Sequence, residues 1–256
     1  MSLTLLPVSA ASLKELIDED TRAPAWVKSE VTTAYYKRIE ECGEVAAVQV
    51  QGGIKCPEST RIAIAIADDI ISAESKLSEY DRICGDGDCG MVMKAGAEKV
   101  LNSLQSSTDP LLTEDSSYFC NKVADDISNS MGGTSGILLE IFFRRMALYF
   151  TNPSNRLWAD AMVDGLNGIK HYGGAQVGMR TMLDAMEPAI LKFKETGDIE
   201  LAAAAAVAGA ESTKYLVALA GRANYVNSAS MEGTPDPGAV ATAIAFQTAV
   251  KIVKNI

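Results

Sequence analysis

Histidine is almost missing from this chain of 256 residues, in which His171 is the only one. Zinc sites of the HExxH type, Cys2His2 fingers and histidine-rich iron or copper sites all need several imidazole ligands, so the composition excludes them. A Ser-His-Asp triad would have to use His171, which we expect at the exposed end of a helix. We therefore expect chemistry that depends on carboxylates, backbone amides or a bound cofactor.

Positive charge, long apolar runs and paired cysteines are also scarce. The 23 lysines and arginines are outnumbered by 33 acidic residues, and the net charge of −10 argues against a nucleic-acid surface. No apolar stretch approaches the roughly 18 residues of a membrane span, and the N-terminus lacks the basic start of a secretory signal. The 5 cysteines include no CxxC pair, which is typical of a reducing compartment. The sequence therefore predicts a cytoplasmic protein without nucleic-acid or membrane partners.

Helical signals dominate from residue 56 onward. Aromatic residues make up only 6% of the chain, and β-branched alternation is scarce. Asp198 and Asp236 are suited to cap helices, and Gly221 stands where an Ala-rich helix would end. The eight expected helices cover 58–78, 91–105, 115–130 (capped by Thr113 or Asp115), 136–150, 155–172, 181–195, 199–220 and 237 to the C-terminus. Short loops between these helices indicate an all-α bundle.

Residues 1–55 have a different character. Residues 3–8 and 45–50 resemble short strands, and 21–26 form a proline-containing linker. A stretch of this length and composition buries little apolar surface by itself. We expect two parts: a short irregular segment at 1–55, made of the tail of an upstream domain and a linker, and a helical domain at 56–256.

The densest chemical signal is the segment Asp81-Arg-Ile-Cys-Gly-Asp86-Gly-Asp88-Cys-Gly90. Its glycines allow the backbone to turn so that the three aspartate side chains converge. Converging carboxylates repel one another unless a hard cation neutralises them, and an oxygen-only ligand set suits Mg²⁺ or Ca²⁺. The spacing is not that of an EF-hand. The alternative is a solvated acidic turn in which Asp86 or Asp88 caps the next helix.

A second signal, Met131-Gly-Gly-Thr-Ser-Gly136, leads directly into an apolar helix. Small residues at a helix start leave its N–H groups open to a phosphate, and Thr134 and Ser135 add hydroxyl donors. The pattern is neither a P-loop nor a dinucleotide-binding fingerprint, and a tight interhelical turn is the alternative. Together with the acidic segment, it suggests binding of a Mg-nucleotide. Later in the chain, Arg222 is suited either to face a phosphate or a base or to act as a cation at a helix end.

In this order, the segments resemble the nucleotide-binding L (DhaL-type) domain of dihydroxyacetone kinases, the C-terminal half of the single-chain enzymes. The resemblance covers about residues 56–256. It rests on five motifs: Gly85-Asp-Gly-Asp-Cys-Gly90, Met131-Gly-Gly-Thr-Ser-Gly136, Arg180-Thr-Met-Leu-Asp184, Gly221-Arg-Ala-Asn-Tyr225 and Asp236-Pro-Gly-Ala239. That family's L domain is an eight-helix antiparallel barrel, in agreement with the expected helix count.

The resemblance also implies the residues of the site. Two Mg²⁺ ions that bridge the phosphates of ATP or ADP would be held by Asp81, Asp86 and Asp88. The residues implied to contact the nucleotide are Cys89, Gly90, Met91, Val92, Gly133, Thr134, Ser135, Gly173, Met182, Arg222, Asp236, Pro237 and Gly238. No catalytic residue is expected on this chain, because the family holds the ketose covalently through a histidine of a separate K domain.

Two positions depart from the family pattern. Cys89 stands where bacterial two-component relatives carry histidine, and the cysteine form resembles the single-chain enzymes that use ATP. Val177-Gly178-Met179 stands where the family commonly has Pro-Gly-Asp, so a role for that aspartate has no counterpart here.

The resemblance thus implies the ATP-binding half of a glycerone (dihydroxyacetone) kinase. The ketose would be presented by a K domain, and the full-length form would be a homodimer. By itself, the chain should bind Mg-ATP but phosphorylate dihydroxyacetone poorly or not at all. Three alternatives stay open: FAD-AMP lyase (cyclising) activity at the same metal site, an ADP-bound subunit of a phosphorelay, and a non-enzymatic helical interaction module.

Overall fold

The computed structural model describes residues 57–105, 115–152, 154 and 157–254, all within one compact unit, Gln51–Ile256. All regular structure in these ranges is helical, so the expected all-α fold is confirmed. None of the described helices combines the length and apolar character that a bilayer crossing requires. The strands expected at 3–8 and 45–50 and the linker at 21–26 lie outside the described residues. The division of the chain after residue 55 therefore stays a prediction.

Eight long helices form the framework of the described part. They are α2 (Pro57–Ser72), α4 (Cys89–Gln105), α5 (Ser116–Ser130), α6 (Gly133–Phe150), α7 (Trp158–Gly173), α8 (Leu183–Thr196), α9 (Ile199–Ser212) and α11 (Pro237–Val253). The shorter elements are α3 (Glu74–Cys84), α10 (Ser228–Met231) and the 3₁₀ helices η1 (Thr213–Tyr215) and η2 (Arg222–Tyr225).

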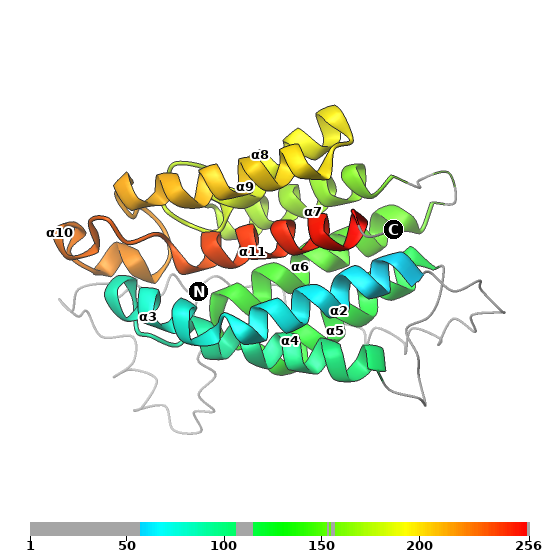
Figure 1. The fold of residues 1–256 in the computed structure, drawn as a ribbon, viewed down its shortest axis with the longest axis horizontal. Helices are drawn as coiled ribbons and strands as arrows, with labels where there is room; N and C mark the ends of the chain where they lie inside the picture. Colours follow the sequence, from blue (N-terminus) through cyan, green and yellow to red (C-terminus); the bar gives the residue numbers. More distant parts are fainter. Residues whose placement is uncertain (1–56, 106–114, 153, 155–156, 255–256) are drawn as a thin grey trace, which may run out of the picture. The chain divides into compact units, whose positions relative to one another are not determined.

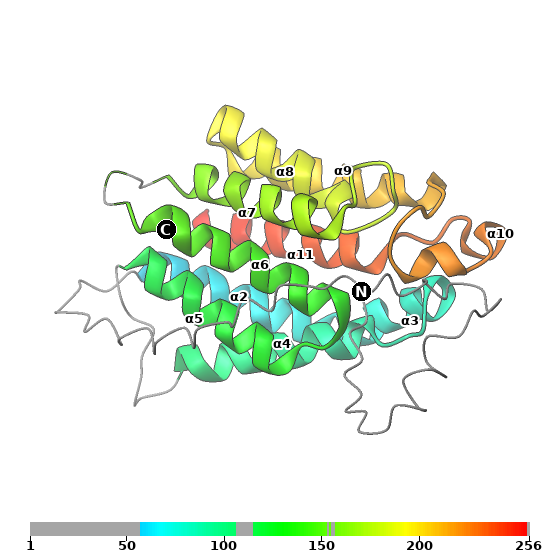
Figure 2. The same ribbon diagram turned by 180° about the vertical axis from the view of Figure 1, so that it is seen from behind.

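The long helices close into a ring. Each packs against the next in the order α2, α4, α5, α6, α7, α8, α9 and α11, and α11 packs against α2 again. Successive members of the ring run in opposite directions (Figures 1 and 2). The result is the antiparallel eight-helix barrel that the resemblance implied. Because the directions alternate, α4, α6, α8 and α11 all begin at one end of the barrel, where α3 and α10 also lie (Figure 1). We call it the loop end.

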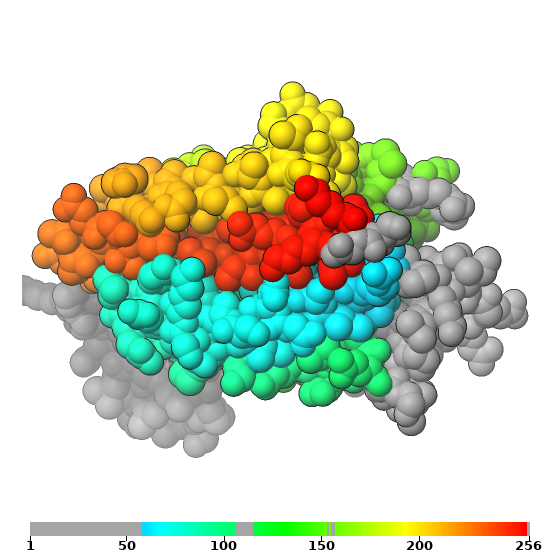
Figure 3. Space-filling view, in the orientation of Figure 1, coloured from blue at the N-terminus to red at the C-terminus, as the bar shows by residue number. Residues whose placement is uncertain are grey.

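Apolar side chains fill the interior of the barrel. Phe119, Phe142, Met146, Ile190 and Phe246 are all buried there, and each belongs to a different helix or a different turn of one. Full burial of such a side chain contributes about 1.5–3 kcal/mol. They line a space of about 660 Å³. From outside, α11 lies between α2 and α9 (Figure 3).

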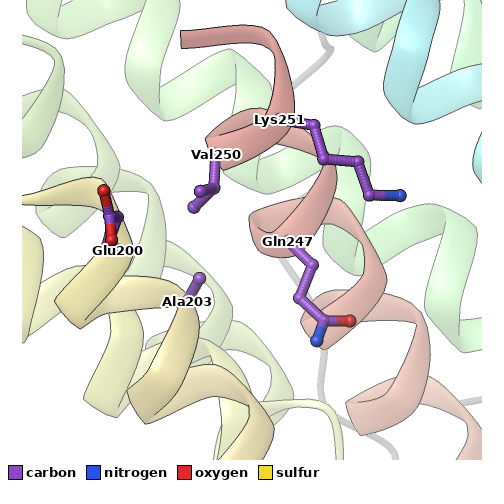
Figure 4. Close-up of a pocket in the computed structure, with 5 residues that line it drawn as sticks. All are labelled: Glu200, Ala203, Gln247, Val250 and Lys251. Carbon is purple, nitrogen blue, oxygen red and sulfur yellow. The ribbon is translucent and has the colours of Figure 1, made fainter. Parts of the chain in front are cut away.

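A shallow groove marks the other end of the seam between α9 and α11 (Figure 4). Its lining includes Glu200 of α9 and Lys251 of α11. Both are paired, Glu200 with Lys254 at 2.8 Å and Lys251 with Asp69 of α2 at 3.0 Å. These exposed ion pairs contribute little to stability, but they mark where the last helix meets its two neighbours.

Several helix boundaries differ from the sequence expectation, and three of these differences concern segments next to the site. The helix expected at 58–78 is interrupted at Ala73, and the second part continues as α3 to Cys84, so that Asp81 is helical. The apolar helix expected from 136 begins three residues earlier, at Gly133.

The third difference concerns the Ala-rich helix expected to reach residue 220, which ends at Ser212. Thr213 is completely buried there and is held by tertiary hydrogen bonds, since its hydroxyl accepts the N–H of Asp236 at 2.8 Å and its carbonyl accepts from Arg180 at 3.1 Å. Gly221 precedes η2 with a φ of 69° instead of ending the helix. Contacts from distant segments therefore override the helix propensity of the sequence.

Candidate metal and nucleotide site

The loop between α3 and α4 carries the three aspartates that the sequence singles out. Asp81 is buried in the last turn of α3, whereas Asp86 and Asp88 follow in the loop. One carboxylate oxygen from each lies within 4.8 Å of the other two. Oxygen ligands of this number and charge suit a small hard divalent cation. The three residues therefore fit the predicted Mg²⁺ site, and their role as its ligands stays a prediction.

Backbone geometry sets this convergence. Gly87 has a φ of 82°, which an L side chain rarely adopts, so the loop turns tightly between the exposed Asp86 and the half-buried Asp88. A Cβ added to Gly85 would lie 2.6 Å from Oδ1 of Asp81, closer than any side chain allows. The other oxygen of Asp81, Oδ2, accepts the backbone N–H of Cys89 at 2.9 Å. Asp81 thus fastens the end of α3 to the first residue of α4.

Arg222 is the cation nearest to the exposed aspartates. Its guanidinium, on η2, pairs with the carboxylate of Asp86 and reaches Oδ2 of Asp88 at 3.2 Å. Arginine stays charged at every physiological pH, and its planar fork matches carboxylate and phosphate oxygens equally well. The side chain is exposed, so a phosphate placed beside the aspartates would lie within its reach.

The Gly-rich start of α6 lies beside the same arginine. Gly133 has a φ of 69°, and a Cβ built on it would be 3.6 Å from Nη2 of Arg222. Gly132 has no side chain to cap the helix, so the first N–H groups of α6 stay open. Thr134 is exposed and Ser135 is half-buried. The structure therefore brings together the acidic segment and the Gly-rich segment, which lie far apart in the sequence.

The start of α4 supplies a second helix N-terminus at this place. Asp88 precedes the helix, and its carbonyl accepts the N–H of Val92 at 3.0 Å. Gly90 is buried because α3 crosses here: an added Cβ would be 2.1 Å from the carbonyl oxygen of Glu74. Met91, by contrast, is 59% exposed. Four residues of this turn, 89–92, are predicted to contact phosphate. Among them, Gly90 allows α3 and α4 to cross closely, because it has no side chain.

The loop before α11 and the first turn of this helix carry the last group of predicted site residues, Asp236, Pro237 and Gly238. Asp236 caps α11, since its Oδ1 accepts the N–H of Ala239 at 2.8 Å, and Pro237 is the buried first residue of the helix. Burial raises the pKa of Asp236 to about 6, with the charges of Asp184 and Asp81 in the same direction, whereas the Ala239 hydrogen bond and Arg180 lower it. This loop is therefore electrostatically linked to the buried aspartate of the metal loop.

Two of the predicted residues lie apart from the exposed cluster. Gly173, the last residue of α7, packs on α6, where its added Cβ would be 3.0 Å from Leu138. Met182 is buried, and its side chain lines the barrel interior. Its backbone approaches Gly238, whose added Cβ would lie 3.3 Å from Cβ of Met182. Met182 therefore lies in the barrel interior, behind Gly238, and its side chain is not exposed at the site.

Cys89 remains a neutral thiol in these surroundings. Burial raises its pKa to about 12, and the nearby charges of Asp81, Asp236 and Asp88 add to the effect. A thiol is nucleophilic only as the thiolate. Cys89 therefore contributes its backbone and its size and not a reactive sulfur.

Sequence reasoning missed Arg180. It is 1% exposed, yet an arginine in a Gly-containing loop is expected in solvent, so residue type and spacing gave no signal of its burial. Its place in a motif shared with the resembling family was the only hint. His171 meets the expectation of an exposed helix end, where its ring stacks edge-on against Tyr172.

The chain is similar in sequence to several kinases among the curated proteins. Among curated proteins, the chain is 34% identical over 276 residues to a putative 3,4-dihydroxy-2-butanone kinase of Solanum lycopersicum, covering 99% of this chain and 46% of the relative. It is 34% identical over 269 residues to the triokinase/FMN cyclase of Rattus norvegicus (100% and 46%) and 31% identical over 269 residues to the dihydroxyacetone kinase of Pichia angusta (94% and 44%). The chain therefore spans less than half the length of these relatives.

Solved structures show the same fold. The native dihydroxyacetone kinase of C. freundii superposes with a TM-score of 0.67 at 24% identity, covering 95% of this chain and 43% of that one. The same kinase in complex with AMP-PNP and Mg²⁺ gives a TM-score of 0.65, with 95% and 42% covered. Residues 83–251 match the DAK2 domain family, a span that runs from the acidic loop to the last helix. The chain belongs to the DAK2 domain family.

Proposed function

We propose that this chain is the nucleotide-holding half of an ATP- and Mg²⁺-dependent kinase that phosphorylates dihydroxyacetone to dihydroxyacetone phosphate. The observation that carries the proposal is the convergence of three aspartates within 4.8 Å beside the N-termini of α4 and α6. The relatives support it, since they include dihydroxyacetone kinases, and one related structure holds AMP-PNP and Mg²⁺.

The chemistry of phosphoryl transfer fits these residues. The substrate hydroxyl attacks the terminal phosphate, so the protein has to position the reactants and neutralise charge and need not supply a nucleophile. Two Mg²⁺ ions held by Asp81, Asp86 and Asp88 would neutralise the charge of the phosphates. Open N–H groups at the start of α6 would donate to phosphate oxygens, and the guanidinium of Arg222 lies close enough to do the same.

The remaining roles follow the same layout. The turn of α4 from Cys89 to Val92 and the hydroxyls of Thr134 and Ser135 would border the phosphates. The loop at 236–238 would close over the nucleotide, with Gly173 and Met182 around it. The ketose-holding histidine is proposed for a K domain, because His171 is exposed and stacks against Tyr172. A full-length homodimer in the cytoplasm completes the proposal.

Calorimetry on the 256-residue chain tests the proposal. We expect Mg-ATP to bind the wild type and Asp86→Ala to weaken binding at least about tenfold, which corresponds to 1.4 kcal/mol. Asp68→Ala is the matched control, since Asp68 is an exposed aspartate of α2 outside the site. Binding that Asp86→Ala leaves untouched would contradict the proposed metal site. Efficient phosphorylation of dihydroxyacetone by this chain alone would contradict its assignment as half of the enzyme.

A second candidate reaction is favoured by one relative. The rat protein is named triokinase/FMN cyclase, which supports FAD-AMP lyase activity as an alternative use of the same aspartates. That reaction splits FAD into AMP and a cyclic flavin phosphate. Turnover of FAD with Mn²⁺ by a protein that carries this chain together with its substrate domain would favour the alternative, and the absence of turnover would leave the kinase proposal.

A further inference from the structure

Arg180 is the largest fully buried side chain in the described part of the protein. Its φ of 61° is the only positive value among the described residues other than glycine. Both features oppose folding, because a guanidinium loses its hydration on burial and an L-residue is strained in the left-handed region. A residue persists in such a state only where the surrounding structure holds it, and strain of this kind gathers at functional sites.

The guanidinium of Arg180 is held by four residues from three segments of the chain. Its Nε donates to the carbonyl of Thr213 in η1 at 3.1 Å, and Nη2 donates to the carbonyl of Thr234 at 2.6 Å. Nη2 also reaches Sγ of Cys84 at 3.3 Å and the carbonyl of Met231 at 3.5 Å, while Nη1 reaches Sδ of Met231 at 3.4 Å. All of these acceptors are uncharged. The side chain therefore fastens segments of the chain to one another.

The fastened segments are those that carry the candidate site. Cys84 ends α3 and directly precedes the acidic loop, and its sulfur also lies 4.0 Å from the carbonyl of Pro235. Thr234 precedes Asp236, whose N–H is bound by the Thr213 hydroxyl at 2.8 Å. Arg180 thus contacts two loops, at Cys84 directly before 85–88 and at Thr234 within 234–236.

We propose that Arg180 is a positioning residue that holds loop 85–88 in register with loop 234–236, so that a divalent cation and a nucleotide bind cooperatively. The inference rests on the proposed function, because it concerns the same ion and nucleotide. A planar guanidinium serves several acceptors in different directions at once, whereas a lysine ammonium acts as a point charge. Its positive charge also lowers the pKa of Asp236, which keeps that carboxylate more readily ionised.

The test measures coupling between two ligands. The Kd of Mn²⁺ is determined by electron paramagnetic resonance with and without saturating ADP, and the ratio of the two values is the coupling factor. We expect Arg180→Lys to lower this factor at least about tenfold, while the Kd of Mn²⁺ alone changes less than about threefold. Circular dichroism verifies that the variant is folded. Arg145→Lys is the matched control, because Arg145 pairs with Asp164 between α6 and α7, away from the two loops.

A second variant keeps the inference testable if Arg180→Lys does not fold. Thr213→Val preserves the size of a buried side chain but removes the hydroxyl that binds the N–H of Asp236. It should lower the coupling factor in the same direction, by about threefold or more. A folded Arg180→Lys or, failing that, a folded Thr213→Val with the wild-type coupling factor would overturn the inference while the proposed function stands. If the wild type binds neither Mn²⁺ nor ADP, the proposed function fails and the inference fails with it.

Discussion

At the residue scale, Asp236 combines a structural role with an unusual ionisation. Its carboxylate caps α11, yet burial raises its pKa from the ordinary 3.8 to about 6. The folded protein therefore holds this proton more tightly than the unfolded chain does between about pH 4 and pH 6. Stability contributed by the group is present below this window and is lost as the pH rises through it.

Asp236→Asn should remove this pH dependence, because the amide oxygen still accepts the N–H of Ala239 but does not ionise. Relative to the wild type, the variant should gain about 1–2 kcal/mol of unfolding free energy between pH 4 and pH 7, measured by urea unfolding in EDTA. Asp198→Asn is the matched control, because Asp198 caps α9 from an exposed position. A difference between Asp236→Asn and the wild type that stays constant with pH would contradict the assignment.

Individual residues of the site were predictable to different degrees. Asp81, Asp86 and Asp88 are close in sequence, so the Gly-rich loop predicted their convergence, which the structure shows. The approach of Arg222 to Asp88 spans 134 positions in the chain, which is beyond what motif spacing reveals. The burial of Arg180 was missed altogether, because it results from contacts with three segments that meet only in the folded molecule.

At the element scale, Gly209 of α9 marks a close approach between α8 and α9. A Cβ added to Gly209 would lie 2.0 Å from the carbonyl oxygen of Asp184 and 2.9 Å from Cα of Ala185. Both are backbone atoms, so no side-chain rotation relieves the clash. Gly209 therefore sets the distance between these two helices.

Gly209→Ala should destabilise the protein by about 2 kcal/mol or more, since overpacking at a rigid contact outweighs the gain in helix propensity. Urea unfolding followed by circular dichroism measures the effect. Gly132→Ala is the matched control, because its added Cβ meets no atom within 4 Å and its φ of −85° suits any residue. Equal stabilities of the two variants would show that α8 and α9 can separate without cost.

The boundaries of the elements were predictable where local chemistry decides them. Asp198 and Asp236 cap α9 and α11 as expected, and Asp115 caps α5. The predicted end of α9 was wrong. Hydrogen bonds from Arg180 and Asp236 hold Thr213, and these contacts override the helix propensity of the Ala-rich sequence. Local signals fixed where these helices start, whereas distant contacts decided where this one stops.

At the scale of the whole molecule, stability depends on closure of the ring. The last helix, α11, packs against α9, α8 and α2 and so joins the end of the described chain to its beginning. It buries Phe246 together with a row of alanines that includes Ala239 and Ala241. Without it, apolar faces of α2 and α9 would face water.

A chain that ends at residue 235 should therefore lose its cooperative thermal transition and most of its helical circular dichroism. Loss of Phe246 alone costs about 3–5 kcal/mol, a large part of the 5–15 kcal/mol that stabilises a typical domain. Addition of a peptide covering 236–256 should restore part of the helical signal, and the full chain with Phe246→Ala serves as the intermediate case. A cooperative transition in the shortened chain would show that the other seven long helices of the described part fold without closure.

The sequence by itself determined the helical class, most helix starts and the acidic loop, because capping, helix propensity and short-range turns act over a few residues. It also carried the motifs by which the chain resembles dihydroxyacetone kinases. Only the tertiary structure decided that α11 closes on α2, that Arg222 pairs with two of the aspartates next to Gly133, and that Arg180 is buried. These arrangements depend on contacts between segments far apart in the chain, whose free energy is gained only when the whole barrel has formed.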